Sequence, residues 1–116
     1  MIGVPFAAVS TADQLLQHVA SWPSMRASAR GRRVSFRTYG SARALGTLDL
    51  GSGVLDVDMP PDVVPSVLRS HPELARSATG VRFELVDARG LATAEWLLHR
   101  RLAVERYARQ YRDASP

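Results

Sequence analysis

The sequence predicts a single α+β domain in which one antiparallel sheet of about five strands carries helices on one face. Two observations lead to this fold class. Short stretches of alternating apolar and polar residues, separated by glycine-containing turns, are typical of antiparallel strands. Stretches with apolar residues at helical spacing precede, interrupt and follow them. The resulting order, α-β-β-β-β-α-β-α, fits the packing of helices on one face of a sheet.

Three segments predict helices. Residues 11–21 follow the potential capping hydroxyl of Ser10 and end at Trp22-Pro23, because proline disfavours helix in the residue before it. Residues 60–71 begin with two prolines, which the first turn of a helix tolerates. Residues 91–111 contain neither glycine nor proline and form a long closing helix.

The strands between these helices are recognised by alternation. The clearest is residues 54–59, Val-Leu-Asp-Val-Asp-Met, which follows the turn Gly51-Ser52-Gly53. The weakest is residues 25–30, which precede Gly31. The predicted strands cover residues 25–30, 34–39, 44–50, 54–59 and 81–86, and residues 72–80 are predicted to form a loop.

The turn at Gly51–Gly53 allows a prediction of register. Pairing Leu48 with Leu55 and Gly46 with Val57 directs one apolar face toward the core. A shift of one residue would mix apolar and acidic side chains on the same face. The predicted register also pairs Ala44 with Met59. The opposite face of the hairpin is polar and gathers Thr47, Asp49, Asp56 and Asp58, and the alternation places Leu45 on this face as well. The predicted core includes Phe36, Leu48, Leu55, Val57, Phe83 and Leu98.

Composition limits the class of protein. A chain of 116 residues with 46% hydrophobic residues fits one domain with a real core, covering residues 1–116. Residues 1–9 and 112–116 are expected to be loosely ordered. The absence of cysteine excludes disulfides and thiolate metal sites, and no apolar run approaches the ~20 residues of a membrane helix. We therefore expect a cytoplasmic protein with no membrane association.

All 15 basic side chains of the chain are arginine, and the formal net charge is +4. A GC-rich genome explains such a bias without any function. Arginine also recognises phosphate and carboxylate groups through paired hydrogen bonds. The closing helix is basic, which allows weak nucleic-acid binding, or only a solvated helix face. Its arginines are Arg100, Arg101, Arg106, Arg109 and Arg112.

Several of these residues also carry a family resemblance. The points of similarity are Leu15-Leu16, Trp22-Pro23, Leu45-Gly46, Leu55-Asp56-Val57, Met59-Pro60, Leu68, Val81, Phe83, Leu97-Leu98 and Tyr107. In this pattern the chain resembles the small bacterial family known as "luciferase" domain proteins, whose biochemical activity is largely uncharacterised. The name does not imply a flavin-dependent luciferase, which needs a barrel of roughly 250 residues.

The chain departs from this family at its histidines. Members usually carry a histidine pair just after the glycine that corresponds to Gly46, and another near the loop before the last strand. Here those places hold Thr47 and Asp49, and Ala78 and Thr79. Chemistry that depends on those histidines is therefore not carried over to this chain.

The polar sheet face is the first candidate site. Asp49, Asp56 and Asp58 share it with Arg33 and Arg37 of a neighbouring strand. Such carboxylates could bind a hard cation such as Mg²⁺, or supply a general acid and base. They could equally form a solvated ladder of cross-strand Asp–Arg pairs, which contributes little.

The aromatic and histidine residues give a second set of candidates. Trp22 and Trp96 could stack on a planar ligand, although large aromatics near helix ends more often pack as core corners. His18, His71 and His99 are scattered and have no ligand partner at helical spacing, so no metal site is expected.

These observations favour a non-catalytic binding or accessory domain that acts on a small molecule or a partner protein, without a cofactor. A small enzyme of bacterial specialised metabolism, such as a cyclase, isomerase or hydrolase built on the aspartates, is the first alternative. A weak nucleic-acid binder that uses the arginine-rich closing helix is the second.

Overall fold

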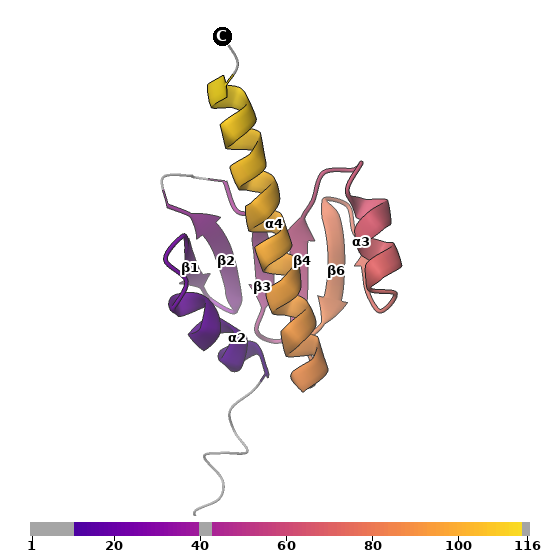
Figure 1. Cartoon of the computed structure of the whole chain (residues 1–116). Coiled ribbons are helices and arrows are strands. Elements are labelled where there is room, and N and C mark those ends of the chain that lie inside the picture. The colour runs from indigo at the N-terminus through magenta and orange to yellow at the C-terminus, as the bar shows by residue number, and fades with distance from the viewer. Residues whose placement is uncertain (1–10, 40–42, 115–116) are drawn as a thin grey trace, which may run out of the picture.

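The computed structural model describes residues 11–39 and 43–114, and within them it shows one antiparallel sheet with helices on one face (Figure 1). The predicted α+β fold is confirmed. The helices are α2 (Thr11–Ala20), α3 (Val64–Ser70) and α4 (Ala88–Ala114), and the strands are β1 (Met25–Arg30), β2 (Arg33–Thr38), β3 (Gly46–Asp49), β4 (Val54–Asp58), β5 (Ala75–Arg76) and β6 (Gly80–Glu84).

The sheet has six strands in the order β1-β2-β3-β4-β6-β5, one more than predicted. The additional strand is the two-residue β5, which lies inside the predicted loop 72–80 and pairs with β6. A strand this short shows no alternation along the sequence, so periodicity could not reveal it.

The last helix begins earlier than predicted because Asp87 caps it. The Asp87 Oδ1 atom accepts a hydrogen bond of 2.9 Å from the backbone N–H of Gly90, which satisfies one of the free donors of the first turn. The helix also continues to Ala114, beyond the predicted end. The predicted cap Ser10, the predicted loose segment 1–9 and the last two residues lie outside the described residues.

The predicted register of the β3–β4 hairpin is confirmed. Leu48 pairs with Leu55, and Gly46 pairs with Val57. The predicted partnership of Ala44 with Met59 is not part of the ladder, because β3 begins at Gly46.

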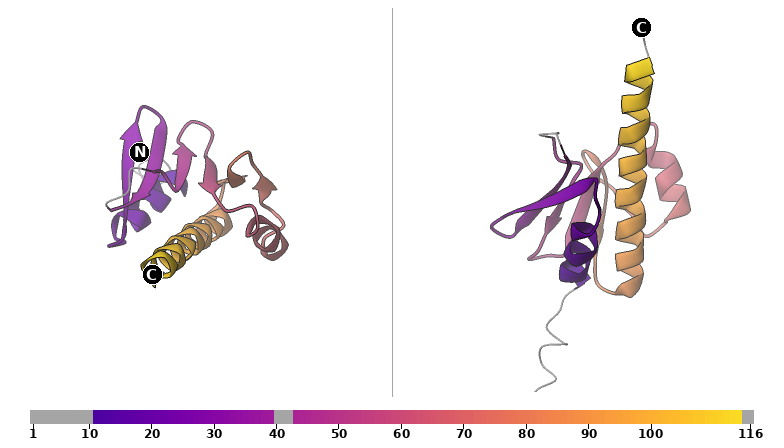
Figure 2. Two further views of the ribbon diagram at one scale, coloured as in Figure 1. Left: turned by 90° about the horizontal axis from the view of Figure 1, so that it is seen from above. Right: turned by 60° about the vertical axis from the view of Figure 1, so that its left-hand side comes forward.

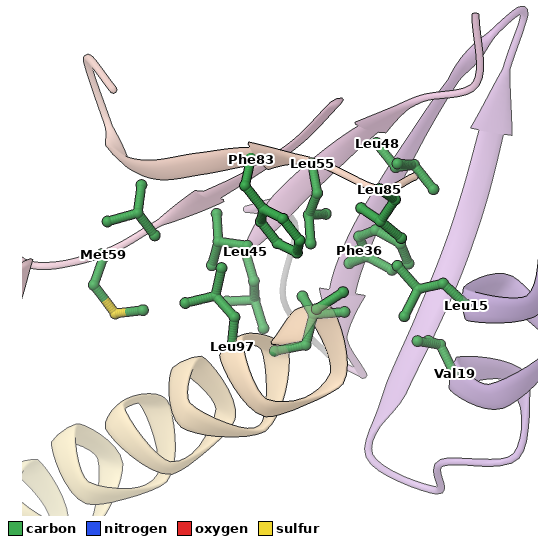
Figure 3. Close-up of a cluster of buried hydrophobic side chains, with 14 of the residues drawn as sticks. Leu15, Val19, Phe36, Leu45, Leu48, Leu55, Met59, Phe83, Leu85 and Leu97 are labelled. Carbon is green, nitrogen blue, oxygen red and sulfur yellow. The ribbon is translucent and has the colours of Figure 1, made fainter. Parts of the chain in front are cut away.

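The core lies between the sheet and the helices, as Figure 3 shows for side chains from α2, α4 and four of the strands. All six predicted core residues are buried. Leu45 is also buried, with 2% of its surface exposed, although the alternation placed it on the polar side. It precedes the first residue of β3, so the strand alternation does not govern its direction. Leu50, beyond the other end of β3, is instead exposed.

Helices cover only one of the two faces of the sheet in the described part of the chain. Seen from above in Figure 2, the described helices all lie on the same side of the sheet. α2 packs against β1, α4 crosses β4, and α3 lies beside β5 and β6. No described helix covers the opposite face, which we call the open face. This arrangement leaves a hollow where the sheet, α3 and α4 meet.

Candidate functional site

The predicted aspartates lie on the open face. Thr47 is paired with Asp56, and Arg33 with Asp49, in neighbouring strands of the ladder. Asp58 is two residues beyond Asp56 and so points to the same side. The prediction of a common polar face therefore corresponds to the folded arrangement.

Each of these three carboxylates has separate partners. Asp49 Oδ1 accepts the backbone N–H of Gly51 at 2.8 Å, which closes the turn after β3. Asp56 Oδ1 accepts the hydroxyl of Ser77 at 2.8 Å. Asp58 Oδ2 pairs with Arg43 Nη2 at 2.9 Å. Across the described residues, no cluster of three or more acidic or histidine side chains is arranged to hold a metal ion.

The two tryptophans stack on histidines of the chain itself. Trp22 lies over the ring of His99 with centroids 3.9 Å apart. Trp96 lies beside His71 with centroids 4.2 Å apart. The third histidine, His18, pairs through Nδ1 with Glu95 at 2.8 Å. These contacts fasten α4 to its neighbours, and both rings that were candidates for ligand stacking already have an aromatic partner.

A cleft of about 620 Å³ lies where β4 ends and β6 begins. Its walls come from Asp58 and the following Met59–Pro61, from Val64 of α3, from residues 76–80, and from Arg101 of α4. We call it the Arg101 cleft. It lies on the helix side of the sheet and reaches the sheet end, where Asp58 and Arg43 also line a smaller hollow on the open face.

Arg101 is the most unusual residue of this cleft. Only 7% of its surface is exposed, although an arginine is rarely buried without full pairing. Its Nη1 donates to Glu105 Oε2 at 3.1 Å, one helical turn further along α4. Its Nε is buried and has no hydrogen-bond partner among the described atoms. The guanidinium is therefore only partly satisfied within the protein.

The charges that line the Arg101 cleft are mainly positive. Arg43 and Asp58 form an ion pair and offset each other. Arg101 is paired with Glu105 of its own helix. Arg76 is exposed, and its side chain forms no ion pair or hydrogen bond with a described residue. The rest of the lining is largely apolar, with Met59 and Val64 among it. A site of this composition attracts an anion.

Hydrogen bonds fix the turn that forms one wall of the cleft. Within it, the Ser77 backbone N–H donates to the Gly80 carbonyl at 2.9 Å. The Met59 N–H donates to the Thr79 carbonyl at 3.0 Å, which ties the turn to the end of β4. The Ser77 hydroxyl donates to Asp56, as described above, so Asp56 supports the cleft from the open face.

Of the predicted site residues, only Asp58 lines the Arg101 cleft. Arg76 and residues 77–80 were missed because they fall in the predicted loop 72–80. Arg101 was counted among the surface arginines of the closing helix. Its spacing gives a signal that could have found it: Leu97, Leu98 and Leu102 place position 101 on the buried stripe of the helix.

The closing helix presents fewer arginines than the sequence suggested. Arg100 is exposed, Arg101 is buried, and Arg106 Nη2 donates to the Ser24 hydroxyl at 3.4 Å. Arg109 and Arg112 lie beyond the last side chain that the structure describes.

No family model, curated protein or solved structure matches this chain. The resemblance to the "luciferase" domain family therefore stays a prediction. None of the helices in the described part of the chain is long and apolar enough to cross a membrane.

Proposed function

We propose that this domain binds a small anionic molecule in the Arg101 cleft and does not convert it chemically. The observation that carries this proposal is the buried guanidinium of Arg101, which lines the cleft with its Nε unpaired. A buried charge costs free energy unless it is paired and hydrogen-bonded. One carboxylate on the same helix pairs with Arg101, and an anion in the cleft would supply a second.

The geometry of arginine supports an oxyanion as the ligand. A guanidinium presents its donors as a planar fork, which matches the two oxygens of a carboxylate or phosphate. Arg76, which lines the same cleft from β5, is free to contact the same group.

The volume and lining indicate the rest of the ligand. Small-molecule sites enclose about 300 to 1,000 Å³ and are lined mainly by apolar side chains with a few polar groups. The cleft, at about 620 Å³, lies inside that range. Met59, Pro60 and Val64 give it an apolar wall, so we expect a ligand with one acidic group and an apolar body.

Titration calorimetry with simple probes tests this proposal. Benzoate and phenyl phosphate carry an acidic group on an apolar ring, whereas benzamide has the ring without the charge. We expect saturable binding of at least one of the two anions and none of benzamide. Equal binding of benzamide and benzoate would contradict a site built for an anion.

Three variants connect the binding to the cleft. Arg101→Met keeps an unbranched side chain of similar length but removes the charge, and it should abolish binding. Arg76→Gln affects an exposed side chain, so folding is not at risk, and it should weaken binding about 10-fold. Arg100→Gln removes the same charge from the exposed neighbour of Arg101 and should have no effect. If Arg100→Gln weakened binding as much as Arg76→Gln did, general attraction rather than the cleft would be responsible.

A further inference from the structure

The first two strands contain a concentration of arginine. Residues 25–38 hold five of the chain's 15 basic residues, and the entire stretch 14–48 contains no Asp or Glu. We call residues 25–38 the arginine hairpin; it comprises β1, the turn at Gly31-Arg32, and β2. Its arginines are Arg26, Arg30, Arg32, Arg33 and Arg37.

The register of this hairpin places four arginines on one face. Arg26 pairs with Arg37, and Arg30 pairs with Arg33. Because Arg33 also neighbours Asp49 on β3, this is the open face of the sheet. The two pairs are separated by about 13 Å along the strands, from a rise of roughly 3.3 Å per residue. Only Ser28 and Ser35 lie between them. Arg26, Arg30 and Arg33 are exposed, and Arg37 is half-buried.

The positive charges of the arginine hairpin are not neutralised within the described structure. None of its five guanidinium groups forms an ion pair or hydrogen bond with a described residue. In Arg37 the Nε atom is buried without a partner. Like charges directly opposite in a sheet repel each other, so this array is destabilising by itself. An external polyanion would relieve that repulsion.

The shape of the hairpin favours a nucleic-acid duplex. β1 is an edge strand, and all of its residues except Met25 are exposed. In the right-hand view of Figure 2 the β1–β2 hairpin extends away from α4. The major groove of B-DNA is about 12 Å wide and admits a two-stranded β-ribbon. Arginine on such a ribbon reaches the phosphates on both sides of the groove.

The composition of the hairpin does not favour a lipid surface. Insertion into a membrane interface depends on large apolar side chains beside the basic ones. The exposed large apolar residues of the described structure are Tyr39, Leu50 and Val86, and none belongs to residues 25–38.

From this arrangement we infer that the arginine hairpin is a second binding site, which takes a nucleic-acid duplex through its phosphate backbone. The site is separate from the Arg101 cleft and does not depend on the function proposed for it. About four phosphate contacts predict an affinity that falls on the order of 100-fold between 50 and 200 mM salt.

Fluorescence anisotropy of the full chain with a labelled 20-base-pair duplex tests this inference. Two double variants remove the array: Arg26→Gln with Arg30→Gln on the exposed edge strand, and Arg33→Gln with Arg37→Gln on β2. The matched control is Arg69→Gln with Arg89→Gln, which removes the same charge from α3 and the start of α4. Circular dichroism melting checks that each variant folds.

We expect duplex binding at 50 mM salt that each hairpin variant weakens at least 10-fold. The slope of log affinity against log salt should also fall by about two, one per arginine removed. The control pair should leave both quantities unchanged. The inference would be overturned if the control pair lost as much duplex affinity as the hairpin variants, or if the full chain did not bind the duplex at 50 mM salt. Binding only to a single strand or to phosphatidylserine–phosphatidylcholine vesicles would overturn it too.

Discussion

Gly80 sets how closely the turn at residues 77–80 approaches β4. A Cβ added at this position would overlap the carbonyl oxygen of Val57 and lie 2.6 Å from the backbone nitrogen of Met59. Both are backbone atoms of the neighbouring strand and cannot move aside as the end of a side chain would. Glycine is therefore required for the wall of the Arg101 cleft to close against the sheet.

We predict that Gly80→Ala lowers the free energy of unfolding by about 1 to 3 kcal/mol, because the turn must shift away from β4. Gly90→Ala is the matched control. Its added Cβ would lie 3.6 Å from the nearest atoms, an ordinary contact, and glycine within a helix is unfavourable by roughly 0.5 to 1 kcal/mol. Urea unfolding should show a lower free energy of unfolding for Gly80→Ala and no decrease for Gly90→Ala. Equal stability of the two variants would contradict the close approach of the turn to β4.

A substitution at Leu55 tests the register of the β3–β4 hairpin. It is fully buried opposite Leu48, so Leu55→Ala should cost about 2 to 5 kcal/mol. Leu50→Ala makes the same chemical change at a turn residue that is 37% exposed, and it should stay within about 0.5 kcal/mol. Denaturant unfolding measures both. A loss below 0.5 kcal/mol for Leu55→Ala would mean that the paired face is not the core.

The element that organises the helical layer is α4. It is fastened to α2 by the His18–Glu95 pair, to the segment after α2 by Trp22 on His99, and to the segment after α3 by His71 beside Trp96. The contacts reach α4 from both sides, because α2 and α3 flank it (Figure 1). The helix is thereby fixed in rotation, which keeps Arg101 directed at the cleft.

Glu73 adds a pH-dependent link between the segment after α3 and α4. A hydrogen bond from its own backbone N–H lowers the pKa of its carboxyl below the ordinary value of 4.5, and His71 and Thr93 lower it further, against the effect of burial. A lowered pKa in the folded state means that the ionised form stabilises the fold. This contribution is complete above pH 4.5 and is lost as the pH falls through the folded-state pKa.

We therefore predict that Glu73→Gln is less stable than the parent chain at pH 6, and that the difference shrinks between pH 5 and pH 3. Nearly half of the Glu73 side chain is exposed, so the difference should be small. Thermal unfolding of both chains across this range measures it. A difference that widens toward pH 3 would contradict the assigned direction.

How far the sequence predicts these elements depends on their length. Strands of four or more residues alternate over enough positions to show a buried face, which is why β2, β3 and β4 and the β3–β4 register were predicted. β5 has two residues and depends on its neighbour β6. The start of α4 was missed because the pattern of apolar residues begins only at Leu91, whereas the cap at Asp87 lies before it.

For the candidate site, the sequence predicted the residues that share a strand face and missed those that come together in space. Asp56 and Asp58 alternate along β4 and were expected to be neighbours. Arg101 and Arg76 are 25 residues apart in the chain, and nothing in their local sequence indicates that they line one cleft. Only the crossing of α4 over β4 brings them together.

At the scale of the whole molecule, two surfaces differ in chemistry. The open face carries the arginine hairpin on β1 and β2, followed by the three aspartates on β3 and β4. The helical side contains the Arg101 cleft at the junction of sheet, α3 and α4. The fold thus places the basic surface and the proposed anion site on opposite sides of the sheet.

The proposed anion site depends most directly on the unpaired Nε of Arg101. Nitrogen-15 NMR detects arginine Nε–H groups individually, and the Arg101 signal can be assigned by its absence from Arg101→Met. During titration with benzoate and, separately, with phenyl phosphate, we predict a saturable shift of this signal with at least one anion, while the Arg100 signal stays in place. If the Arg101 signal did not move with either anion, or if both signals drifted together without saturation, the Arg101 cleft would not be an anion site.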